Sequence, residues 1–292
     1  MTAGLALFSA GAYALADLTN MHLMRSAGLV CTLVWVLAIG FVLTMAVSLA
    51  LNGPPSGSEL VPAAKAAAAG MLTVGALGCL FKGLRVGRLA IVAPIVALDG
   101  GFAVLAALVF GERVEPLQAV GLVTAVGGGL LAAVTRPERP PGADGRPQRK
   151  SPGRLGLDRG VGWALISACC FATSYLLYGR AGGHLPIVTW VAISLGAGLA
   201  VVLPAALMGS RLRPPREAWP KLLGSGVLET GGMLLMVAAL TRGPLPVAAV
   251  LLAQVATLGA LFGAFFLREP LASHQWIGVA LTVIAATVLA GA

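Results

Sequence analysis

The second half of the chain repeats the first half at an offset that stays between 155 and 158 residues. Each copy contains five hydrophobic spans. Because that number is odd, the second copy must lie upside down relative to the first in a membrane. We therefore predict an all-α integral membrane protein of ten transmembrane helices, built as two inverted five-helix repeats. The clearest matches are seven residues of the first span, Gly4, Ala6, Leu7, Ser9, Ala10, Ala14 and Leu18, which recur as Gly162, Ala164, Leu165, Ser167, Ala168, Ala172 and Leu176.

The composition places these spans in a lipid bilayer rather than in a water-soluble core. The chain has 292 residues, of which 58% are hydrophobic and 11% are charged, and its mean hydropathy is +0.91. A bilayer accepts apolar segments of about 20 residues, and its interior offers no water to backbone groups, so each span should be helical. The expected spans are residues 3–23, 29–51, 61–81, 89–110, 116–134, 161–179, 187–208, 222–240, 246–267 and 275–291.

Residues 135–160 differ in kind and are expected to link the first repeat, residues 1–134, to the second, residues 161–292. They contain five prolines and seven basic residues against three acidic ones, which is typical of a solvated, flexible linker. A basic segment can bind nucleic acid or anionic lipid. A cytoplasmic loop that holds the protein in its orientation is the simpler interpretation, so we expect no nucleic-acid partner.

The remaining basic residues also favour one side of the membrane. Outside the linker, four Lys and Arg residues fall on the side of the N-terminus and nine fall on the opposite side, which holds 16 of the 20 when the linker is included. Basic residues collect in cytoplasmic loops. The distribution therefore predicts a multi-pass protein of the cytoplasmic membrane with both termini outside the cytoplasm.

Several short motifs lie in and between the fourth and fifth spans of the first copy, and some recur in the second. They are Ala93-Pro94, Phe110-Gly111-Glu112-Arg113, Gln118 and Gly121, with Arg268-Glu269-Pro270, Gln275 and Gly278 in the second copy. With the ten spans and the repeat, these motifs resemble the EamA-type transporters of the drug/metabolite transporter superfamily over nearly the whole chain. The resemblance implies a ten-helix carrier that moves small metabolites, often outward, and holds its substrate in a cavity between the two halves. Family members are commonly described with both termini in the cytoplasm, whereas the charge distribution here predicts the opposite.

Three acidic residues fall within the expected spans and are candidates for binding substrate or protons. They are Asp17, Asp99 and Glu229. An ionisable group at bilayer depth costs about 2.5 to 3.5 kcal/mol to insert, so each should face the bundle interior, a polar partner or water. Asp99 lies near the middle of its span, after Pro94 and before Gly100-Gly101, where a bent or open helix would free backbone groups for a ligand. For Asp99 the alternative is a protonated carboxyl that bonds to a neighbouring helix, and for Asp17, near the end of its span, the alternative is a pairing with Arg25 or solvent.

Other polar residues within the spans can add hydrogen bonds or an aromatic face for a cation. Gln254 and Tyr175 are the candidates that we retain, with Tyr13 and Tyr178 as further donors. Each of these residue types also occurs commonly in packing roles. Because no basic residue lies deep in a span, the carboxyl groups favour cationic, zwitterionic or neutral small molecules, such as amino acids, amines or drugs.

Two other classes of protein must be compared with a transporter. A membrane enzyme needs a nucleophile and a base, or metal ligands, at membrane depth, and the spans supply neither, so we expect no enzyme, metal or cofactor. A scaffold that does not transport has no reason to keep carboxyl groups at the midplane. We expect alternating access of the two halves about Asp99 and Glu229, with protons as the coupling ion. A facilitated carrier without proton coupling stays open as an alternative.

Overall fold

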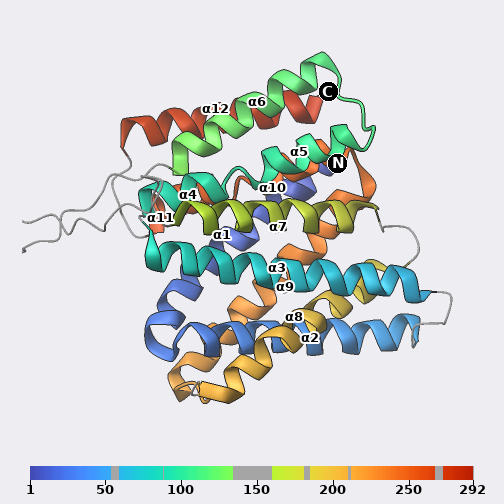
Figure 1. The fold of residues 1–292 in the computed structure, drawn as a ribbon, viewed down its shortest axis with the longest axis vertical. Helices are drawn as coiled ribbons and strands as arrows, with labels where there is room; N and C mark the ends of the chain where they lie inside the picture. The colour runs from blue at the N-terminus through green and yellow to red at the C-terminus, as the bar shows by residue number, and fades with distance from the viewer. Residues whose placement is uncertain are drawn as a thin grey trace, which may run out of the picture.

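The protein is a bundle of helices in a computed structural model (Figure 1). The structure describes residues 1–53, 59–87, 89–133, 160–180, 185–209, 212–266 and 272–291. The expected linker, apart from its last residue, lies outside the described residues, as does the Arg268-Glu269-Pro270 motif. All the regular elements among the described residues are helical, which confirms the predicted all-α class.

Each predicted span coincides with one helix or with two short consecutive helices. Within the described ranges, six helical segments are long and apolar enough to cross a membrane, and three shorter apolar helices accompany them. The first half contains α1 (Thr2–Ala27), α2 (Leu29–Asn52), α3 (Leu60–Val86), α4 (Leu89–Val96), α5 (Asp99–Val109) and α6 (Pro116–Ala133). The second half contains α7 (Gly160–Arg180), α8 (Ile187–Gly209), α9 (Trp219–Arg242), α10 (Leu245–Leu252), α11 (Val255–Phe266) and α12 (Ser273–Gly291), with a short 3-10 turn, Arg216–Ala218, before α9.

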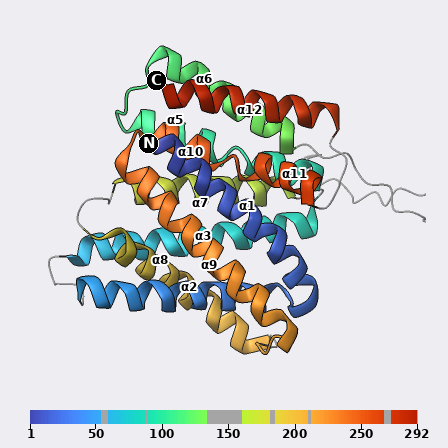
Figure 2. The ribbon, with the colours of Figure 1, turned by 180° about the vertical axis from the view of Figure 1, so that it is seen from behind.

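The helices of one half pair with helices of the other half. The main contacts join α1 to α9, α3 to α7, α2 to α8 and α6 to α12. The repeat matches α1 to α6 with α7 to α12 in order. Exchanging the two halves therefore turns the pair α1–α9 into the pair α3–α7, and it leaves the pairs α2–α8 and α6–α12 unchanged. In Figures 1 and 2, α6 and α12 cover one end of the long axis, and α2 and α8 lie toward the other.

Both chain termini lie on one side of the bundle, where α1 begins and α12 ends (Figures 1 and 2). We call this side the terminal face, and the side where α1 ends the opposite face. The helices run from one face to the other, so a residue near the middle of a helix lies near the middle of the membrane. Glu229 lies near the middle of α9, and Asp99 lies near the middle of the fourth span, where α4 gives way to α5.

Glycines that recur in both copies allow the helices to approach closely. A Cβ atom on Gly70 would overlap the backbone of Ser194, and one on Gly278 would lie 2.6 Å from the backbone oxygen of Gly128. These contacts hold α3 against α8 and α12 against α6. In lipid, where helices gain little from hydrophobic burial, such close packing is a main source of helix association.

A second recurring residue type, glutamine, caps a helix in each half. Gln275 Oε1 accepts a 2.9 Å hydrogen bond from the backbone N–H of Ala272, just before α12. Gln118 Oε1 accepts a longer bond, 3.4 Å, from the N–H of Glu115 before α6. Both side chains reach back three residues to a helix start, as in a capping box. The shared glutamines therefore serve the helix ends rather than a ligand.

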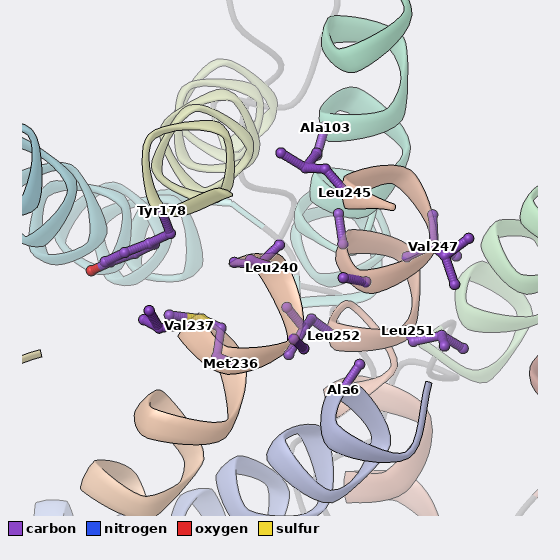
Figure 3. Close-up of a cluster of buried hydrophobic side chains, with 14 of the residues drawn as sticks. Ala6, Ala103, Tyr178, Met236, Val237, Leu240, Leu245, Val247, Leu251 and Leu252 are labelled. Atoms are coloured by element: carbon purple, nitrogen blue, oxygen red, sulfur yellow. The ribbon is translucent and has the colours of Figure 1, made fainter. Parts of the chain in front are cut away.

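The apolar core is centred on α9 and α10. Figure 3 shows Leu240 of α9 facing Leu245 and Leu252 of α10, with Ala6 of α1 close by. Every residue of α10 is buried, from Leu245 to Leu252. Such a helix has no face free for lipid, and it fixes the start of α11 at the centre of the bundle.

Candidate functional site

The fourth span of the first half is broken in the middle of the membrane. The helix α4 ends at Val96, the chain turns at Ala97 and Leu98, and α5 begins at Asp99. Pro94 lies inside α4, where its missing N–H and its ring weaken the hydrogen bonding of the turn before the break. The break puts Asp99 at the start of a new helix, where backbone N–H groups have no partner within the helix.

The two glycines after Asp99 meet different neighbours. A Cβ atom on Gly100 would lie 2.7 Å from the Cβ of Ala253 and 3.0 Å from the backbone oxygen of Ala249, so this glycine lets α5 press against α10. A Cβ atom on Gly101 would make an ordinary 3.7 Å contact with Val126 on α6. Of the two glycines, only Gly100 lies so close to the neighbouring helix that a side chain would not fit.

The Asp99 side chain is 8% exposed and is held by two hydrogen bonds. Its Oδ1 accepts a 2.7 Å bond from the N–H of Gly100. Its Oδ2 accepts a 3.2 Å bond from the hydroxyl of Tyr175 on α7. Both of these partners are uncharged, so a ligand or a proton is left to balance the carboxylate.

The second carboxyl site lies between α1 and α9. Glu229 Oε1 accepts a 3.0 Å hydrogen bond from Nδ2 of Asn20, and the hydroxyl of Ser225 donates a 2.5 Å bond to Oδ1 of the same asparagine. Asn20 is 6% exposed, whereas Glu229 is only partly buried. Asp17 is exposed on the same side of α1, three residues before Asn20, and its charge acts on that of Glu229. Asp17 had Arg25 as an expected alternative partner, but the side chain of Arg25 is not described.

Two tyrosines lie between the carboxyl sites. Tyr175 bonds directly to Asp99, whereas Tyr13 is near enough to Glu229 and to Tyr175 for their charges to interact but bonds to neither. The hydroxyl of Tyr13 instead reaches the sulfur of Met236 at 4.0 Å. The polar groups are therefore spread across the bundle from Asp99 past the tyrosines to Glu229, with hydrogen bonds at the two ends. We call this set of groups the carboxyl–tyrosine series.

Each carboxyl group of the series is held from the other half of the chain. Asp99 belongs to the first half, and its partner Tyr175 belongs to the second. Glu229 belongs to the second half, and its partner Asn20 belongs to the first. In the described part of the chain neither carboxyl is paired with a basic side chain. A movement of one half against the other would therefore change what both carboxyl groups contact.

Gln254 bonds to none of the groups in this series among the described residues. It occupies a second break, at Ala253–Gln254, between α10 and α11. Its Nε2 donates to the carbonyl oxygens of Ala125 and Val250, each at 3.1 Å, and its Oε1 accepts from Thr257 at 3.0 Å and from Thr282 at 3.1 Å. An amide side chain has two donor hydrogens and two acceptor lone pairs, so the whole hydrogen-bonding capacity of Gln254 is used inside the protein.

The structure therefore brings together four of the five predicted binding residues: Asp99 with Tyr175, and Glu229 with Asp17. Asn20 and Ser225 complete the Glu229 site but were not among the predicted residues. An asparagine inside an apolar span is a polar signal of the same kind as the acids, and it could have been read from the sequence. Among the described residues no group of three or more His, Cys, Asp or Glu could hold a metal ion.

A bundle of apolar spanning helices with carboxyl groups at mid-depth is typical of a membrane transport protein. Residues 158–291 match the model of the EamA-like transporter family. The second half of the chain is thus an EamA-like transporter domain, and the predicted resemblance is confirmed. Proteins of this family are membrane transporters and not enzymes, so the function that the matched half implies is transport across a membrane.

The fold is shared with a solved crystal structure over almost the whole length. The two structures superpose with a TM-score of 0.74, covering 98% of this chain and 94% of the other, at 17% sequence identity. At that identity the likeness concerns the fold alone. None of the curated proteins matches this chain closely enough to count as a relative.

Proposed function

We propose that the protein exports small cationic, zwitterionic or neutral molecules by alternating access, with proton binding at Asp99 and Glu229 coupled to the movement. The observation that carries the proposal is that each carboxyl is held by a side chain from the opposite half. Loss or gain of a proton changes the hydrogen bonding of a carboxyl group. A contact that spans the two halves couples that change to their relative position.

The chemistry of the carboxyl–tyrosine series supports the proposed substrate class. It offers carboxyl oxygens, two phenol hydroxyls and two aromatic faces, together with the amide of Asn20. These groups bind an ammonium or a hydrogen-bond donor well, and a polyanion poorly. The substrate of this carrier is therefore a small molecule with an amine or amide group.

The asymmetry of the broken helices supports alternating access. At the terminal face α5 packs against α10. The equivalent pair at the opposite face, α11 and α4, has no comparable contact within the described residues. A carrier that is closed at the terminal face and looser at the opposite face has this packing. If α4 packed against α11 and α5 separated from α10, the terminal face would open instead.

A cluster at the terminal face supports the same interpretation. The guanidinium of Arg180, at the end of α7, lies 4.1 Å over the ring of Phe110 and donates a 3.3 Å hydrogen bond to the carbonyl oxygen of that residue. Phe110 follows α5 directly. This contact ties the end of α5 to the second half, and it must break if the terminal face opens.

The orientation follows from charge. With most Lys and Arg residues at the opposite face, that face is cytoplasmic and the termini are outside, in the cytoplasmic membrane. The state described here is then looser toward the cytoplasm, as an exporter is before it takes up its substrate. The outward direction itself comes from the family resemblance.

The experiment is substrate counterflow in liposomes that contain the purified protein. A panel of amino acids, amines and drugs is tested as internal substrate, and uptake of the labelled compound is followed. We expect Asp99→Asn and Glu229→Gln to lose most of the exchange that the wild type shows, while Glu217→Gln, an exposed carboxyl outside the series, retains it. Full exchange in both site variants would refute the assignment of the carboxyl groups.

A further inference from the structure

An apolar groove runs along the outside of the bundle between α1, α11 and α12. Its volume is about 830 Å³, and it is lined by side chains from residues 4–15, 254–262 and 279–287. At Leu15 it meets a smaller pocket of about 370 Å³ that reaches the opposite face. We call the two together the lateral groove. The smaller pocket is lined by Leu15, Leu18, Thr19, His22, Lys221 and Phe266.

The lateral groove is separate from the carboxyl–tyrosine series. Tyr13 and Asn20 of α1 face α9, as their contacts with Met236 and Glu229 show. Phe8 and Leu15 line the groove on another side of the same helix, and Phe8 is 75% exposed. At membrane depth an exposed apolar surface meets lipid chains rather than water.

The groove becomes basic where it reaches the membrane surface. Lys221 and His22 are both exposed there, and within the described part of the chain the Lys221 ammonium has no acidic partner. The Nδ1 atom of His22 lies 3.0 Å from the carbonyl oxygen of Leu18. A carbonyl oxygen only accepts hydrogen bonds, so Nδ1 carries the proton and Nε2 is left for another partner.

The equivalent place at the terminal face is filled by the protein itself. By the register of the repeat, Lys221 and His22 correspond to Lys65 and Arg180, and Phe266 lies one residue before the position that corresponds to Phe110. At the terminal face Arg180 lies over the ring of Phe110. At the opposite face the shorter His22 stands in place of the arginine, and a pocket lies beside Phe266. The two faces therefore share a lysine and a phenylalanine, but only at the opposite face does a pocket remain beside the phenylalanine.

We propose that the lateral groove binds one anionic phospholipid from the leaflet at the opposite face. The phosphate lies at Lys221 and His22, and an acyl chain follows α1 toward the bundle centre. Gly11 is 11 residues from His22, which is about 16 Å along a helix, and one hydrocarbon leaflet is about 15 Å thick. The chain therefore ends near Gly11, where a Cβ atom would meet nothing within 4 Å.

The test is native mass spectrometry of the full chain in detergent, titrated with phosphatidylglycerol or with phosphatidylcholine of the same acyl chains. We expect tighter binding of phosphatidylglycerol, and a loss of about fivefold in Lys221→Gln, because one basic residue near a membrane surface contributes about that much to anionic lipid binding. Lys65→Gln, its repeat equivalent, should bind as the wild type does. Gly11→Phe should weaken both lipids, because its ring occupies the place of the chain.

The outcomes separate the parts of the proposal. Equal binding of the two lipids, or the same loss in Lys65→Gln as in Lys221→Gln, would overturn the phosphate site. Unchanged binding in Gly11→Phe would overturn the acyl-chain site. Displacement of phosphatidylglycerol by a similar concentration of glycerophosphate, which lacks chains, would show an anion site without a lipid. The thermal unfolding midpoint of each variant is measured alongside, so that a loss of binding is compared only among folded proteins.

Discussion

Replacing Gln254 by leucine tests whether this residue holds the bundle together or binds a ligand. The side chain is 2% exposed and makes four hydrogen bonds, two to neighbouring turns at Val250 and Thr257 and two that join the break between α10 and α11 to α6 and α12. Hydrogen bonds between helices in a membrane contribute about 0.6 kcal/mol each on average. We therefore expect Gln254→Leu, which keeps the volume and removes all four bonds, to lower the free energy of unfolding by about 2 to 3 kcal/mol.

A smaller change on the same network calibrates the effect. Thr282→Val removes one of the four bonds with little change of shape, so it should cost about 0.6 kcal/mol. The assay is unfolding in mixed micelles with increasing SDS, followed by loss of helical circular dichroism. If Gln254→Leu were as stable as the wild type and yet could not transport, the residue would be a ligand and its structural role would be refuted.

Two further predictions concern residues that recur in both copies. Gly70→Val should destabilise the protein by at least about 2 kcal/mol, because its side chain meets the backbone of Ser194, whereas Gly75→Ala, which points into open space, should change stability by less than about 0.5 kcal/mol in the same SDS assay. Gln275→Ala should cost about 1 kcal/mol through the lost cap of α12, and Gln118→Ala less, because its bond is longer; equal losses would contradict this ranking.

The fold could be predicted from the sequence because of the repeat. The repeat gave five spans per copy at matching positions, and the helices observed coincide with those spans. The residues that survive in both copies, such as Gly70, Gly278 and Gln275, turn out to contact backbone or helix ends. They maintain a common scaffold, which explains why they repeat.

The acidic candidates could be predicted because they do not repeat. Asp99 and Glu229 are costly at membrane depth and have no equivalent in the other copy, so each stands out as serving this chain in particular. Their partners were harder to foresee. Contacts such as that of Glu229 with Asn20 join residues more than 200 positions apart, and they depend on the angle at which α1 crosses α9.

The second helix break had no local signal. The sequence around Ala253 and Gln254 contains neither proline nor glycine, unlike the break before Asp99. The turn is supported by hydrogen bonds from Gln254 to α6 and α12, which become visible only when the helices are assembled. Gln254 was predicted as a binding residue because the sequence cannot distinguish an amide that binds a ligand from one that bonds to neighbouring helices.

Proton movement tests the central claim most directly. Protein in liposomes with a pH-sensitive dye inside is given a gradient of a substrate found by counterflow, and the internal pH is recorded. We predict a substrate-dependent pH change in the wild type and in Glu217→Gln, and none in Asp99→Asn or Glu229→Gln. A pH change that persists in both site variants would contradict this prediction, and substrate transport by the wild type without any pH change would show an uncoupled carrier.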